Sequence, residues 1–205
     1  METGVENLIT AACLSLVGPR HTLIAARETV PDRAGLYAIY GATATWLQLG
    51  LDEPPDERPL YVGKAEESLV SRDLNTHFRV GRTGQSTVRR AFAGLLRDEL
   101  GLRGIPRNQQ APERPANFAL STEHDAALDV WMNARLELAV WTKPADCSSL
   151  GAIEVGVFAK WSPPLNVRDN RSTWRAKVLA ARKVMANDAR SWVIQRGLSM
   201  KSQKT

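Results

Sequence analysis

Two short segments in the first third of the chain are rich in apolar and aromatic residues. Gly35 to Tyr40 reads GLYAIY and Pro59 to Val62 reads PLYV, and both contain residue types that favour strands. Gly50 to Arg58, between them, holds two prolines and four acidic residues and is typical of a surface loop. We expect the two strands to pair as a hairpin with a long connection.

Helical spacing of apolar residues predicts most of the other elements. A helix is expected from Ala65 to about Phe78, and the next begins after Ser86, a good N-cap, and stops at Gly101. An N-terminal helix is expected over 8–17, a proline-rich loop over 104–115 and a third strand over 136–141. Two late helices are expected over 148–161 and 172–195. This mixture of strands and helices predicts an α+β protein.

The length of the chain suits one domain. Its 205 residues, 43% of them hydrophobic, are enough to enclose a sizeable core. Neither internal repeats nor low-complexity segments divide it. We therefore expect residues 1–205 to form a single domain, with the helix at 172–195 as its last addition.

Targeting signals are weak. No segment approaches the roughly 18 apolar residues of a membrane span. The apolar run at 8–17 follows Glu2 and Glu6 rather than the positive leader of a signal peptide. Cys13 and Cys147 lie far apart without zinc-site spacing, so we interpret them as small buried residues. These features predict no membrane association and a reducing, cytoplasmic environment.

Basic residues are unevenly distributed along the chain. The net charge of +5 is modest, but residues 163–205 contain ten Lys or Arg against two acids. A second zone, 72–107, contains eight Arg against three acids. Such clustering is typical of proteins that bind a polyanion such as nucleic acid. A merely solvated basic surface has the same composition, so charge alone leaves both interpretations open.

Glu154 stands at an unusual place in its predicted helix. Leu150, Ile153, Val157 and Trp161 recur at helical spacing and mark the inward face, and Glu154 shares that face. A carboxylate there loses hydration and needs a compensating cation. An arginine in a salt bridge and a bound metal ion are both open alternatives.

The helix that begins after Ser86 carries Arg89 and Arg90 in its first turn, where the helix dipole disfavours cations. A bound anion would reverse this effect. Backbone N–H groups, the hydroxyls of Ser86 and Thr87 and two guanidinium groups together suit a phosphate. The turn before the helix lacks the lysine of a nucleotide-binding loop, so we interpret these residues as a contact to nucleic-acid phosphate.

The chain resembles the GIY-YIG nucleases in five elements that follow the family's order. Gly35-Leu36-Tyr37 matches the first signature, and Tyr61-Val62-Gly63-Lys64-Ala65 matches the second. Arg72 matches the helix arginine, Glu154 the late acid and Asn166 the terminal asparagine. The resemblance spans about residues 33–166.

Two further details look most similar to the restriction-enzyme branch of this family. A histidine, His77, follows Arg72, and the run from Ser86 to Arg90 reads STVRR. Residues five apart lie about 140° from each other around an unbroken α-helix. Arg72 and His77 therefore share a face only if the helix bulges between them.

The resemblance implies a small three-stranded antiparallel sheet flanked by helices. It also implies an endonuclease that hydrolyses DNA phosphodiester bonds with one Mg²⁺ or Mn²⁺ ion. By analogy Glu154 binds the ion, which polarises the phosphate, and Arg72 stabilises the phosphate as it is attacked.

The other site residues also receive roles from the resemblance. Tyr37 takes the proton of the attacking water, and because a free phenol titrates near 10, Lys64 or His77 is expected to assist it. Tyr61 orients water or phosphate, and Asn166 fixes the site by hydrogen bonds.

Other functions stay open beside a restriction-type endonuclease. A repair or mobile-element nuclease would use the same site on branched or damaged DNA, and a catalytically silent module would keep only the DNA-binding surface. RNA binding is less favoured because no aromatic-rich signature accompanies the basic zones. One active site cuts one strand at a time, so an enzyme that cuts a palindrome would act as a homodimer.

The last predicted helix, 172–195, is interpreted as a DNA-docking element. Apolar residues at helical spacing pack on the domain, and Arg175, Arg182 and Lys183 belong to the positive surface beside them. A basic helix that only faces solvent is the alternative.

Overall fold

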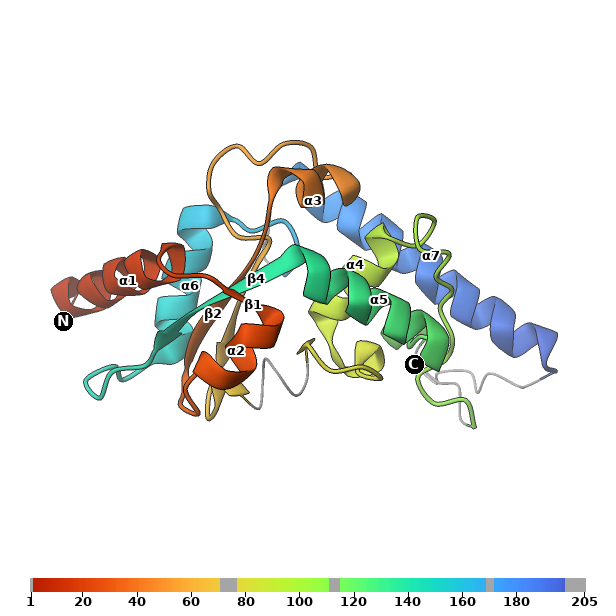
Figure 1. Ribbon diagram of the computed structural model, residues 1–205, viewed down its shortest axis with the longest axis horizontal. Helices are drawn as coiled ribbons and strands as arrows, with labels where there is room; N and C mark the ends of the chain where they lie inside the picture. The colour runs from red at the N-terminus through yellow and green to blue at the C-terminus, as the bar shows by residue number, and fades with distance from the viewer. Residues whose placement is uncertain (1, 71–76, 111–114, 169–171, 198–205) are drawn as a thin grey trace.

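An antiparallel sheet of four strands, in the order β1-β4-β2-β3, forms the centre of the computed structural model (Figure 1). The structure describes residues 2–70, 77–110, 115–168 and 172–197. The strands are β1 (His21–Thr22), β2 (Gly35–Gly41), β3 (Tyr61–Ala65) and β4 (Leu136–Thr142). Because β2 pairs with both β4 and β3, β3 is left at one edge of the sheet.

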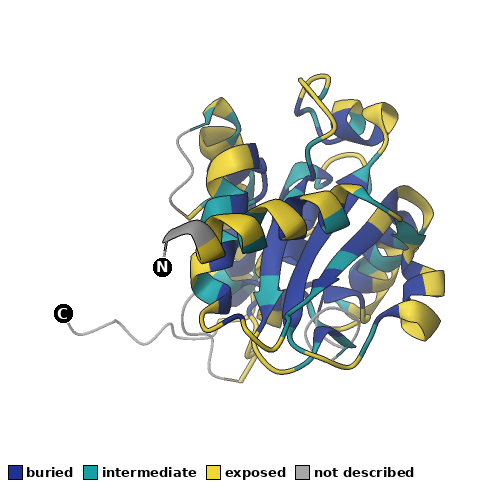
Figure 2. Ribbon diagram, turned by 90° about the vertical axis from the view of Figure 1, so that its left-hand side faces the viewer, coloured by how far each residue is buried: buried dark blue, intermediate teal, exposed yellow. Residues whose placement is uncertain are grey.

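Helices cover both faces of this sheet (Figure 1). One face packs against α1 (Glu2–Val17) and α6 (Leu150–Trp161). The larger core on the other face includes α2 (Leu23–Thr29), α3 (Thr43–Gln48), α4 (Thr87–Leu95), α5 (Thr122–Arg135) and α7 (Thr173–Gln195). Seen from the side of α1, the buried strands lie behind this helix (Figure 2). No helix in the described ranges is both long and apolar enough to cross a membrane.

The side chains of β2 divide between the two cores, since successive residues of a strand point to opposite faces. Leu36, Ala38 and Tyr40 pack in the core beneath α1 and α6. Tyr37 and Ile39 point into the larger core. The first-signature tyrosine is thus directed towards α4, away from α1.

The predicted α+β fold is confirmed, with one strand more than expected. The two aromatic strands pair antiparallel, with Tyr37 opposite Gly63, as the hairpin prediction requires. The additional strand is the two-residue β1, which extends the sheet beyond β4. Sequence periodicity gave no indication of β1, α2, α3 or α5, which are short or have a mixed apolar pattern.

Helix boundaries follow local capping residues. Ser86 is the N-cap of α4 and accepts a hydrogen bond from the Arg89 N–H at 3.1 Å, as predicted. The helix ends at Leu95, earlier than expected, and Gly101, with φ of 64°, lies in a later turn. Ser149 is the N-cap of α6. The helix ends at Trp161, and its C-cap, Ser162, precedes the two prolines.

The helix predicted from Ala65 to Phe78 is only partly described. Ala65 belongs to β3, and Arg72 lies outside the described residues. Val70 and His77 have the wide hydrogen-bonding pattern of a π-helix. The chain between Arg72 and His77, where a bulge was expected, lies outside the described residues.

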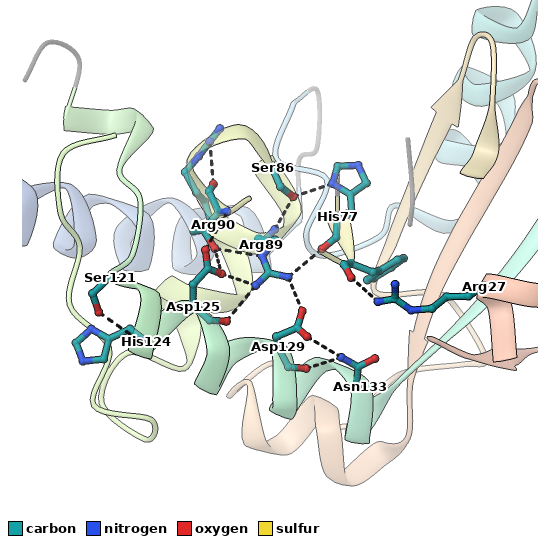
Figure 3. A network of polar contacts seen from close by, with 12 residues as sticks. Arg27, His77, Ser86, Arg89, Arg90, Ser121, His124, Asp125, Asp129 and Asn133 are labelled. Atoms are coloured by element: carbon teal, nitrogen blue, oxygen red, sulfur yellow. Dashed lines mark hydrogen bonds and ion pairs between the residues drawn. The ribbon is translucent and has the colours of Figure 1, made fainter. Parts of the chain in front are cut away.

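A buried charge network links α4 to α5 (Figure 3). The guanidinium of Arg89 is fully buried and forms ion pairs with Asp125 and, at 3.1 Å, with Asp129. It also donates to the hydroxyl of Thr83 at 3.2 Å and to the backbone carbonyl of His77 at 3.2 Å. Arg89 therefore holds the segment around His77 against α5.

This network corrects two of the four phosphate contacts predicted at the start of α4, those of Ser86 and Arg89. Arg89 and Ser86 are both fully buried, the charge of Arg89 is already neutralised, and the Ser86 hydroxyl is used inside the protein. Arg90 is 7% exposed and donates to the carbonyls of Thr83 and Gly84 at 3.3 and 2.9 Å. Of the four predicted residues, Thr87 alone is exposed.

Replacing Arg89 by Met should lower the free energy of unfolding by about 3–5 kcal/mol, because Asp125 and Asp129 would keep charges without their cation. Denaturant unfolding followed by circular dichroism measures this. The control is Arg82→Met, which removes an arginine bonded to exposed Gln85, and we expect a change within about 0.5 kcal/mol. Equal stability of the two variants would contradict the role given to Arg89.

Candidate active site

Tyr37 lies across the edge strand β3, over a glycine. Gly63 stands opposite Tyr37 in the β2–β3 pair. A Cβ atom on Gly63 would come within 2.9 Å of Cε1 of the Tyr37 ring, and closer still to its hydroxyl. Real Cβ atoms essentially never make such contacts, so the glycine of the second signature is required by the tyrosine of the first.

A chain of hydrogen bonds joins Tyr37 to the start of α4. The Tyr37 hydroxyl lies 2.8 Å from Nε2 of His77. On the other side of the ring, Nδ1 of His77 lies 2.7 Å from Oγ of Ser86, a contact that Figure 3 shows. Tyr37 and Ser86 are fully buried and His77 is 1% exposed. The half-buried Tyr61 completes the group, with its ring centroid 6.0 Å from that of Tyr37 and 6.3 Å from that of His77.

The surroundings of Ser86 indicate which groups donate and which accept in this series of hydrogen bonds. Its Oγ accepts the N–H of Arg89, and within the described chain His77 Nδ1 is the other polar atom that it contacts. The hydroxyl proton of Ser86 is therefore directed to Nδ1, which leaves the ring proton of a neutral His77 on Nε2. With this tautomer, His77 donates its hydrogen bond to the Tyr37 oxygen.

A pocket of about 710 Å³ lies where β3, α6 and the segment after α6 meet. Four of the predicted site residues line it: Tyr61, Lys64, Glu154 and Asn166. The other lining residues are Val62, Gly151, Val155, Phe158 and Arg168. Tyr37 and His77 are buried and do not line this pocket. Gly63, which the Tyr37 hydroxyl overlies, lies between the lining residues Val62 and Lys64.

Glu154 sits at the margin of the inward face of α6. The apolar residues that mark this face are all buried, as predicted, namely Leu150, Ile153, Val157 and Trp161. The Glu154 side chain is 29% exposed, and its Oε2 lies 3.9 Å from Nζ of Lys64. The carboxylate thus borders the core and opens into the pocket, which fits both alternatives raised above, a basic partner and a metal ion.

Lys64 is held as a cation by two carboxylates. The hydrogen bond from its Nζ to Glu66, at 2.7 Å, is the main cause that raises the pKa of Lys64 above its usual value, and the charge of Glu154 adds to it. A lysine that is charged at neutral pH does not accept a proton from a tyrosine. Of the two groups expected to assist Tyr37, the geometry favours His77.

Asn166 closes the free edge of β3. Its Oδ1 accepts the N–H of Val62 at 2.9 Å, and its Nδ2 donates to the carbonyl of Val62 at 2.7 Å. The Leu165 N–H adds a bond of 3.0 Å to the carbonyl of Leu60. The segment after α6 therefore fixes the strand that carries Tyr61 and Lys64.

The donor set of the pocket fits a divalent ion bound by one carboxylate. In the described ranges no three His, Cys, Asp or Glu residues form a group that could hold a metal. Mg²⁺ typically keeps several waters and binds through one or two carboxylates and the phosphates of its substrate. Glu154 in a roomy pocket supplies the single carboxylate that such an ion needs.

The basic residues expected on α7 differ in their surroundings. Arg175 is exposed and donates to the carbonyl of Val167 at 2.9 Å, Lys183 is exposed, and Arg182 is half-buried. The apolar stripe of the helix packs on the domain through Val178, Met185, Ala186, Ala189 and Val193. Docking of DNA on this helix stays a prediction.

The sequence analysis missed the acids that neutralise Arg89. Asp125 and Asp129 lie one turn apart on α5, whose N-cap, Ser121, accepts a bond from the His124 N–H. An N-cap followed by acids in the first turn is a helix signal. Nothing in the local sequence, however, pairs these acids with Arg89, which is 36 residues from Asp125 and 40 from Asp129.

A family model agrees with this site. The model of the GIY-YIG catalytic domain matches residues 44–184. The match contains the predicted site residues except Tyr37, since β2 precedes it. No curated protein and no solved structure matches the chain significantly. The chain belongs to the GIY-YIG catalytic domain family, and this membership makes it a nuclease-type enzyme, an endonuclease that acts on DNA.

Gly63→Ala should abolish most DNA cleavage, because the added methyl group displaces the Tyr37 hydroxyl from its contact with His77. The measurement is cleavage of plasmid DNA, with circular dichroism to show that the fold persists. Gly4→Ala is the control, since no atom lies within 4 Å of a Cβ at that position. A fully active Gly63→Ala enzyme would show that the position of Tyr37 is unimportant.

Proposed function

We propose that the protein is a restriction-type endonuclease that hydrolyses DNA phosphodiester bonds with one divalent metal ion bound by Glu154. The observation that carries this proposal is the 2.8 Å hydrogen bond between Tyr37 and His77, beside Tyr61. The histidine that follows Arg72 is the feature by which the chain resembles the restriction-enzyme branch. Its contact with the first-signature tyrosine gives that histidine a chemical role.

Tyr37 acts as the general base in this proposal. A hydrogen bond donated by His77 to the phenolic oxygen favours the ionised form of the tyrosine, which can then take a proton from the attacking water. Ser86 and the N–H of Arg89 keep His77 in the donating tautomer. The hydroxyl of Tyr37 lies over Gly63, whose neighbours in β3, Val62 and Lys64, line the pocket that contains Glu154. The proposal brings the proton acceptor and the ion to one phosphate.

The pocket residues hold the phosphate. Lys64 provides a fixed positive charge, and Tyr61 provides a hydroxyl that can orient water or a phosphate oxygen. Asn166 keeps both residues in place through Val62. When bound at Glu154, Mg²⁺ or Mn²⁺ supplies Lewis-acid polarisation of the phosphate and neutralises charge on the leaving oxygen. Arg72 is proposed to stabilise the phosphate as it is attacked.

We also propose that residues 1–205 act as one domain in the cytoplasm. A single site of this kind cuts one strand, so cleavage of both strands at a palindrome calls for a homodimer. A repair or mobile-element nuclease that acts on branched DNA is the second candidate, because the same residues serve either substrate.

Plasmid digestion tests the restriction-type proposal. With Mg²⁺, the purified protein should convert plasmid DNA into discrete fragments, whereas cutting only at branches would identify a repair enzyme and binding without cutting a silent module. Glu154→Gln should abolish cleavage while affinity for DNA in EDTA stays within a few-fold of the parent. The matched control is Glu66→Gln, the other carboxylate on Lys64, which should keep activity. Strong Mg²⁺-dependent cutting by the Glu154→Gln variant would contradict the proposal that Glu154 binds the metal ion.

Tyr37→Phe should lower turnover by about 10²-fold or more, as expected for loss of a general base. Tyr40→Phe is the matched control, because Tyr40 lies on the same strand but its hydroxyl donates to the Leu16 carbonyl on the other face of the sheet. Burial raises the pKa of Tyr40 to about 12, so this tyrosine stays protonated. Single-turnover cleavage at saturating DNA measures the effect, and unchanged turnover in Tyr37→Phe would mean that another group activates water.

A further inference from the structure

Three arginines from separate parts of the chain converge beside α4. The stem of Arg107 lies against Gly84, where a Cβ atom would be 3.0 Å from its Cγ, and the carbonyl of Gly84 accepts a bond from Arg90 Nη1. Gly94, one helical turn after Arg90, packs on α7 with a Cβ position 3.1 Å from the backbone nitrogen of Arg182. Arg90, Arg107 and Arg182 therefore meet where α4, the loop at 102–110 and α7 come together.

This arginine cluster lacks a neutralising carboxylate. In the described ranges, no ion pair involves any of its three members, in contrast to Arg89 and Arg97. Burial, followed by the positive charges of Arg182 and Arg107, lowers the pKa of Arg90 to about 10. Burial also lowers the pKa of Arg182. Like charges gathered at a half-buried place destabilise the free protein unless an anion joins them.

Arg90 carries an unused hydrogen-bonding edge. Its Nη1 is anchored by two backbone carbonyls. Among the described residues, its buried Nε has no partner, and Nη2 makes only a 3.5 Å contact with the Thr87 hydroxyl. In Arg97 the same Nε and Nη2 edge binds the two oxygens of Asp188, at 2.9 Å each. The corresponding edge of Arg90 is held rigidly and has no oxygen pair to bind.

We infer that the cluster of Arg90, Arg107 and Arg182 binds a phosphate group of the DNA backbone, away from the bond that is cut. Guanidinium groups match the tetrahedral oxygens of a phosphate by paired hydrogen bonds. Arg90 lies in the first turns of α4, where the helix dipole adds positive potential, and the exposed Thr87 hydroxyl is adjacent. None of the three residues lines the pocket that contains Glu154.

The assignment to DNA rests on the proposed function, and it deepens that proposal by naming a second contact to the substrate. Of the phosphate contacts predicted at the start of this helix, the inference keeps Arg90, with the Thr87 hydroxyl beside it, and leaves out the fully buried Ser86 and Arg89. Arg107 is exposed, so it provides the flexible side through which a phosphate can approach.

The test compares two double variants with equal loss of charge. Arg107→Gln/Arg182→Gln removes two members of the cluster, whereas Arg103→Gln/Arg196→Gln removes an exposed arginine of the same loop and the exposed arginine that follows α7. Binding to a labelled DNA duplex is measured by fluorescence anisotropy in EDTA over a range of salt concentrations. The slope of log affinity against log salt should become shallower by about one in the first variant, whatever the DNA sequence. It should change much less in the second.

Equal slopes for the two double variants would overturn the inference, because they would show diffuse attraction rather than a built site. These measurements contain no metal and need no cleavage. A protein that binds with the expected slope but never cuts DNA would refute the nuclease proposal and leave the phosphate site intact. Normal cutting with an unchanged salt slope would support the nuclease proposal and refute the phosphate site.

A second measurement separates a DNA phosphate from a free anion and from a structural role. The melting temperature of the parent should rise in inorganic phosphate relative to chloride at equal ionic strength, and this rise should vanish in Arg107→Gln/Arg182→Gln. Without phosphate that variant should melt no lower than the parent, because repulsion has been removed; a large fall would identify the arginines as structural and overturn the inference. Stabilisation by phosphate with an unchanged DNA salt slope would overturn the assignment to DNA.

Discussion

Arg89 brings a positive charge into the interior, where Asp125 and Asp129 offset it. A guanidinium in such a place accepts a single arrangement, because each misplaced donor would lie unsatisfied in a medium of low dielectric constant. Its side chain ties α4 to α5 and to the backbone at His77. Its own N–H bonds to Ser86, the residue that orients the His77 ring. One arginine thus fixes both the place and the tautomer of the histidine beside Tyr37.

The close contact between Tyr37 and Gly63 fixes the position of the tyrosine relative to the edge strand β3. A tyrosine that packs this closely on a glycine has little freedom to move, and its hydroxyl is held against His77. The buried ion pairs of Arg89 therefore position His77, and close packing on Gly63 positions Tyr37. Both constraints act on groups that are almost fully buried, which favours a site organised before DNA binds.

The sequence could predict the parts of this site that depend on neighbouring residues. Ser86 as an N-cap, the inward stripe of α6 and the pairing of β2 with β3 follow from local pattern, and the structure confirms them. The phosphate contact predicted for Arg89 was wrong, because the sequence of the first turn of α4 does not show which partners its guanidinium has. The acids that occupy Arg89 are on α5, a helix that periodicity did not indicate.

The contact between Tyr37 and His77 shows the same limit. The two residues are 40 positions apart, and no spacing rule predicts their meeting; a family resemblance placed both in one site. The arginine cluster was also out of reach from composition, since Arg90, Arg107 and Arg182 come from different elements and are indistinguishable in sequence from their solvated neighbours. Tertiary packing decides which arginines lose their water.

Asn166 has a consequence for the behaviour of the protein in concentrated solution. An edge strand with free N–H and carbonyl groups is a template on which another polypeptide can add as a further strand. By bonding both backbone groups of Val62, the amide of Asn166 imitates one residue of a neighbouring strand and occupies the place where addition would begin. The side chain that fixes the pocket wall therefore also hinders self-association of the sheet through its edge strand, β3.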